Sequence, residues 1–61
     1  MAKNYFRVKD IYSLVNDKRR VRIYGDGKWA IVNYCDGARW YRRKDENSDW
    51  VLYNEQICTN F

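Results

Sequence analysis

Two Asp-Gly dipeptides within one β-rich stretch constrain the fold of this chain more than any other feature. Asp26-Gly27 and Asp36-Gly37 interrupt residues 20–44, in which β-branched and aromatic residues are frequent. Asp-Gly readily adopts the positive φ angles of a two-residue hairpin turn. The stretch therefore predicts three antiparallel strands joined by two tight turns.

The residues on either side of this stretch predict one helix and one further strand. Apolar residues recur at the spacing of one helical face, at Val8, Ile11, Tyr12 and Val15. Asp10 is a suitable N-cap for this helix, and residues 50–53 have the composition of a fourth strand. We expect a single small domain, residues 1–61, of the α+β class. In it a short N-terminal helix packs on a three- or four-stranded antiparallel β-meander; a small SH3-like β-barrel is the alternative.

Strand alternation divides the side chains of the stretch into two faces, because residues that pair across strands share a face. The face that suits the helix is small and mostly aliphatic, with Val21, Ile23, Ala30, Val32, Tyr34 and Tyr41. The opposite face mixes aromatic rings with cations and contains Arg20, Arg22, Tyr24, Trp29, Ile31, Trp40, Arg42 and Lys44. A slip of one residue in either turn would exchange the two faces.

The mixed face is expected to be exposed, since burying unpaired charge is costly. In the barrel alternative, Trp29 and Trp40 would instead lie inside and the cations would extend to the surface. Residues 18–44 contain nine basic and two acidic residues, a balance of nine minus two, or +7, whereas the whole chain has +4. The charge therefore favours an anionic partner.

Aromatic platforms flanked by Lys and Arg are typical of proteins that bind single-stranded nucleic acid, because bases stack on the rings and cations contact the phosphates. A strand pair that reads the major groove of duplex DNA would use the same residue types. We expect a small non-enzymatic module that binds DNA or RNA. The expected binding residues are Arg20, Arg22, Tyr24, Trp29, Trp40, Arg42 and Lys44.

Two other functions fit the composition. Trp, Tyr and Arg are enriched at protein interfaces, so the same face also suits a protein-interaction module, or a small phage-type inhibitor that docks on a larger protein. A metal-independent ribonuclease is the second alternative. VRIYGDGKWAIVNY, about a quarter of the chain, resembles the sheet of small bacterial RNase toxins, which are longer and more helical. An open edge strand would also allow a homodimer.

The residue types that are absent or rare narrow the chemistry. The chain has no His, the commonest general base and a frequent metal ligand, so we expect no enzyme activity, no metal and no cofactor. Cys35 and Cys58 are too few for a disulfide scaffold and are expected to be reduced and buried. With no signal peptide and no apolar run of about 18 residues, we expect a cytoplasmic protein that does not enter the membrane.

Overall fold

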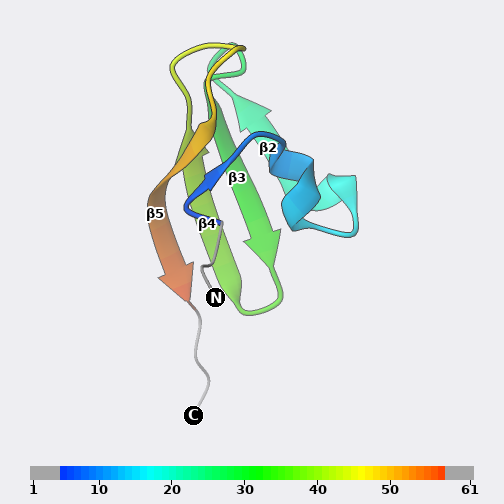
Figure 1. The fold of residues 1–61 in the computed structure, drawn as a ribbon. Coiled ribbons are helices and arrows are strands. Elements are labelled where there is room, and N and C mark those ends of the chain that lie inside the picture. Colours follow the sequence, from blue (N-terminus) through cyan, green and yellow to red (C-terminus); the bar gives the residue numbers. More distant parts are fainter. Residues whose placement is uncertain (1–4, 58–61) are drawn as a thin grey trace.

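The fold is a five-stranded antiparallel sheet, seen in a computed structural model that describes residues 5–57 (Figure 1). Its elements are β1 (Arg7–Val8), η1 (Ile11–Leu14), η2 (Lys18–Arg20), β2 (Val21–Tyr24), β3 (Trp29–Tyr34), β4 (Gly37–Arg42) and β5 (Trp50–Ile57). The strands lie in the order β1-β5-β4-β3-β2. β2 to β5 form a meander, and β1 pairs with the outer edge of β5. In residues 5–57 no helix is long and apolar enough to cross a membrane.

The predicted α+β class is wrong, because the N-terminal helix does not form. Asp10 caps a turn as expected, its carboxylate accepting a hydrogen bond from the Tyr12 N–H at 3.0 Å, but that turn is a four-residue 3-10 helix. Val8 lies in β1, and Val15 is already extended, with φ −133° and ψ 158°. A strand residue followed by one tight turn buries Ile11 and half-buries Val8 and Val15, whereas Tyr12 is 37% exposed. The spacing therefore identified three residues that pack in the core, but not their conformation.

The SH3-like barrel is not found either. β1 and β2 lie at the two ends of the strand order and do not pair with each other, so the sheet in the described residues is open. η1 and η2 both contact β3, and they cover one face of the sheet near β2 (Figure 1). The layer that the helix was expected to supply is therefore built from two 3-10 turns.

The first hairpin confirms the predicted pairing of its strands. Val21 pairs with Val32 and Tyr24 with Trp29, as a two-residue Asp26-Gly27 turn requires. Asp26 and Gly27 have φ angles of 58° and 86°, and the Lys28 N–H donates to the Gly25 carbonyl at 3.0 Å. Positive φ at both central residues matches the right-handed twist of the strands.

The second hairpin turns one residue earlier than predicted. Tyr34 pairs with Gly37, so Cys35 and Asp36 form the turn, and Cys35 is exposed rather than buried. Gly37 is needed for another reason: its φ is 152°, and a Cβ there would lie 2.0 Å from the backbone oxygen of Gln56 on β5. Moving the turn by one residue moves each pairing partner by two, so that Val32 pairs with Arg39 instead of Tyr41. Alternation is therefore preserved, and the exchange of faces predicted for a one-residue slip does not occur. Cys58 lies outside the described residues.

One face of the sheet carries the core. Its buried side chains are Ile11, Val21, Ala30, Val32, Tyr41 and Trp50. Val8, Leu14, Val15, Tyr34 and Leu52 pack around them. Four of the six residues predicted for the aliphatic face are fully buried, whereas Ile23, near the edge of the sheet, is 37% exposed. The opposite face of the sheet is not covered by η1 or η2.

Candidate functional site

A continuous row of side chains crosses the open face of the sheet, with one residue from each strand. Strand pairing aligns Tyr24 with Trp29, Trp29 with Arg42, Arg42 with Val51 and Val51 with Arg7. Paired residues share a face, and neighbouring strands lie about 4.8 Å apart, so the row spans about 19 Å. All five side chains are exposed. We call these residues the cross-strand row.

Tyr53 adds a third large exposed ring to this face, because it follows Val51 by two residues in β5 and alternate residues of a strand share a face. It lies at a β-bulge: Trp40 pairs with Asn54 and Tyr41 with Leu52, so Tyr53 has no opposite residue on β4. The Tyr53 ring lies edge-on to the Trp29 ring, with centroids 5.2 Å apart and planes at 84°. Tyr53 remains 56% exposed and Trp29 38% exposed, so the pair forms an aromatic platform in contact with solvent.

Arg42 lies between the two rings of the platform. Its Cζ is 5.0 Å from the centroid of Trp29 and 5.6 Å from that of Tyr53. Both distances are within the range of cation–π attraction, about 0.5–1 kcal/mol at an exposed site. The guanidinium is thereby held against the aromatic platform at the centre of the cross-strand row.

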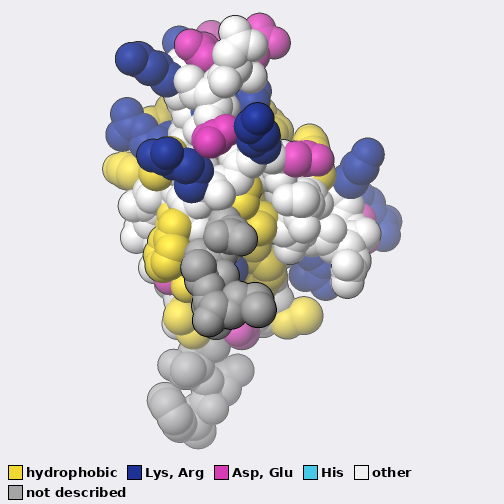
Figure 2. Space-filling model, viewed as in Figure 1, with side chains coloured by type: hydrophobic (Ala, Val, Ile, Leu, Met, Phe, Trp, Pro, Cys, Tyr) yellow, Lys and Arg dark blue, Asp and Glu magenta, His cyan; other side chains and the backbone are white. Residues whose placement is uncertain are grey.

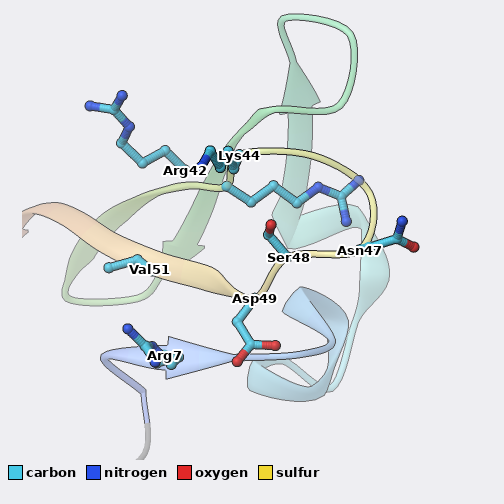
Figure 3. A pocket seen from close by; sticks show the side chains of 8 residues that line it. Arg7, Arg42, Lys44, Asn47, Ser48, Asp49 and Val51 are labelled. Atoms are coloured by element: carbon cyan, nitrogen blue, oxygen red, sulfur yellow. The ribbon is translucent and has the colours of Figure 1, made fainter.

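A basic pocket continues from the platform toward β1. Its volume is 580 Å³, and its lining consists of Arg7, Arg42, Arg43, Lys44, Asn47, Ser48, Asp49 and Val51. Four cations against one carboxylate give this pocket a formal charge of four minus one, or +3. Figure 3 shows Arg7 on β1 across from Arg42 and Lys44, with Asp49, Ser48 and Asn47 at the loop end. In Figure 2, Lys and Arg side chains gather at the upper left, beside hydrophobic side chains.

None of the four pocket cations forms an ion pair with a carboxylate of residues 5–57. The ion pairs found in residues 5–57 are Asp17–Arg19 and Arg39–Glu55, so neither Arg7 nor Lys44 is neutralised by a carboxylate there. Arg43 is different: its Nε donates to the Gly27 carbonyl at 2.7 Å, and its guanidinium lies 4.3 Å from the Trp50 ring centroid. Arg43 therefore connects the wall of the pocket to the first hairpin. The charges of Arg7 and Lys44 remain available to bind an anion.

The loop that closes the pocket is organised by Asp45. Its carboxylate accepts hydrogen bonds from the Asn47 N–H at 2.9 Å and from the Ser48 hydroxyl at 3.1 Å. These two bonds, the backbone one first, hold the pKa of Asp45 below its usual value. The charged carboxylate thus fixes the two polar residues that line the pocket.

Six of the seven predicted binding residues fall into three places. Tyr24, Trp29 and Arg42 lie in the cross-strand row. Arg22 and Trp40 lie in the next row of the same face, where Arg22 is exposed and Trp40 is half-buried. Lys44 lines the basic pocket.

Arg20 is separate from this group. It lies in η2, with its guanidinium 4.0 Å from the Cys35 sulfur at the opposite end of β3. Six residues of extended strand separate that end from Trp29, roughly 20 Å. The structure therefore does not bring Arg20 together with the platform.

Three important residues were missed from the sequence. Tyr53 was placed in a strand, but the pairing of β5 with β4 that brings its ring beside Trp29 has no signal in local composition. Arg7 joins the site only through the long-range pairing of β1 with β5. Arg43 was treated as part of a basic run, yet its side chain contacts Gly27 and Trp50.

Comparison with known proteins adds no identification. No family model matches the chain, and no significant match is found among curated proteins or solved structures. Within residues 5–57, no three His, Cys, Asp or Glu side chains lie close enough to hold a metal ion together.

Proposed function

We propose that this chain is a small non-enzymatic module that binds nucleic acid through the open face of its sheet. The observation that carries the proposal is the position of Arg42, which contacts two exposed aromatic rings and also lines a pocket with a formal charge of +3. Rings and cations in direct contact are the two elements of nucleic-acid binding surfaces. A cytoplasmic location, expected from the low cysteine content, remains part of the proposal.

The test measures fluorescence anisotropy of labelled DNA and RNA oligonucleotides at several salt concentrations. Affinity should fall with rising salt, because each phosphate contact releases counterions. Arg42→Ala should weaken binding and reduce the magnitude of the salt slope by about 1. Arg19→Ala is the matched control, since Arg19 is exposed, paired with Asp17 and located in η2 at the far end of β2.

Three results would contradict this proposal. Lack of affinity for DNA and RNA at low salt would rule out nucleic acid as the partner. An equal loss of affinity in Arg42→Ala and Arg19→Ala would mean that binding is not located on this face. Cleavage of the RNA in the presence of a chelator would show an enzyme, the metal-independent ribonuclease alternative.

A protein partner is the second candidate, favoured by the apolar part of the same face. Tyr24, Val51 and Tyr53 are 48%, 41% and 56% exposed, and Trp and Tyr are the residues that most often anchor protein interfaces. On this interpretation, Trp29→Ala should abolish capture of a partner from lysate while circular dichroism shows an intact fold. Capture that survives nuclease treatment, with no affinity for oligonucleotides, would favour this candidate over the first.

A further inference from the structure

The cross-strand row is chemically asymmetric. Its β2–β3 end carries aromatic rings, Tyr24 and Trp29, with Tyr53 beside them. Its β5–β1 end carries Val51 and Arg7 and leads into the basic pocket. Arg42 lies between the two ends and belongs to both. A ligand that fits this row has a flat, unsaturated part at one end and an anionic part at the other.

The exposed rings favour a single-stranded ligand over a duplex. A ring can stack on a base only when one face of that base is free, whereas inside a duplex both faces are covered by neighbouring bases. Phosphate contacts alone would not require Tyr24 and Tyr53 to remain 48% and 56% exposed on the same face as the cations. The platform therefore fits unpaired bases.

The pocket supplies the anionic site at the required place. Arg7 and Lys44 have no carboxylate partner in residues 5–57, and Ser48 and Asn47 add polar groups to the lining. Arg42 lines the pocket and contacts both rings, so the pocket directly adjoins the platform. A phosphate bound in this pocket and a base stacked on the rings can therefore belong to the same strand.

We propose, building on the nucleic-acid function above, that the ligand is an unpaired strand. Its bases stack on Tyr24, Trp29 and Tyr53, and a neighbouring phosphate occupies the pocket between Arg7 and Lys44. The strand runs across the sheet rather than along one β-strand. DNA and RNA share this chemistry, and the experiment distinguishes them.

The test compares three probes of about 12 nucleotides: a homothymidine DNA, a homouridine RNA and a DNA duplex. Single strands should bind more tightly than the duplex, and the tighter of the two single strands identifies the natural class. Tyr53→Ala should reduce single-strand affinity by about 5- to 140-fold, the equivalent of one stacked base. Tyr53→Phe keeps the ring and should bind like the wild type.

Further variants separate the two halves of the row. Tyr24→Ala repeats the stacking test on another strand, with thermal unfolding as a check that each variant is folded. Arg7→Ala and Lys44→Ala should each reduce the magnitude of the salt slope by about 1 while leaving fluorescence quenching by stacked bases unchanged. Tyr12→Ala, an exposed tyrosine on η1, is the control for loss of a ring elsewhere.

The outcomes distinguish this inference from the proposed function. Equal affinity for duplex and single strand, with Tyr53→Ala unchanged on both, would overturn the single-strand assignment and leave nucleic-acid binding standing. Absence of binding to all three probes would overturn both.

Discussion

Tyr41 should make the stability of this protein fall steeply in alkaline solution. Its side chain is fully buried, and its hydroxyl donates a hydrogen bond to the Tyr5 carbonyl at 2.6 Å. Burial, followed by the nearby Tyr34, raises its pKa to about 12, whereas the unfolded chain has a tyrosine pKa of about 10. The folded state therefore retains this proton more tightly than the unfolded state does.

The sign and size of the effect follow from this difference. Below about pH 10 the stabilisation is present in full, and it is lost as the pH rises through about 12. The difference between a pKa of about 10 and one of about 12 corresponds to roughly 3 kcal/mol. In a small domain with roughly 3–9 kcal/mol of total stability, that loss is large.

Urea unfolding, followed by tryptophan fluorescence between about pH 8 and pH 12, measures this loss. Tyr41→Phe is the matched variant, because it removes the titrating hydroxyl and keeps the ring. At neutral pH the variant should be less stable by about 1 kcal/mol, since the Tyr5 carbonyl loses its partner. At the alkaline end the order should reverse. Parallel curves for the two proteins would refute the argument, because every other titrating group is common to both.

Three further substitutions test the packing that supports the site. Gly37→Ala should destabilise the protein severely, because a Cβ would lie 2.0 Å from the Gln56 oxygen at a φ of 152°; a broadened amide NMR spectrum would show this. Trp50→Ala should cost about 3–5 kcal/mol and leave the chain largely unfolded by circular dichroism, as the ring is 2% exposed. Glu55→Gln, which removes the charge facing Arg39 at 2.7 Å, should lower stability by less than about 1 kcal/mol, measured as the urea midpoint.

The sheet was predictable where local chemistry decides it. Asp26-Gly27 fixes the first hairpin because both residues adopt the positive φ angles that this turn requires. Gly37 was assigned to a turn, but its conformation and the close approach of β5 explain it instead. The residues around Gly37 do not reveal that β5 lies against it. The register of the second hairpin therefore could not be derived from local sequence.

The residue types of the candidate site and the face of the sheet on which they lie could be predicted from the sequence. The full set of its residues could not. Alternation along two hairpins is enough to bring Trp29 and Arg42 to one face, which is how the structure has them. Arg7 and Tyr53 depend on the pairing of β5 with β1 and with β4, and both pairings arise only when the sheet assembles. The helix was expected because amphipathic spacing is shared by a helix and by a strand followed by a tight turn.

β1 has only two residues, and one of them, Arg7, lines the basic pocket. Two residue pairs, Arg7 with Val51 and Val8 with Trp50, hold this strand, together with two hydrogen bonds. The Leu52 N–H donates to the Phe6 carbonyl at 2.8 Å, and the Tyr41 hydroxyl donates to the Tyr5 carbonyl at 2.6 Å. Detaching so short an edge segment requires less free energy than unfolding the sheet. Each such opening would carry the Arg7 cation away while Trp29 and Arg42 stay in position, so the basic pocket would lose one wall without the loss of the aromatic platform.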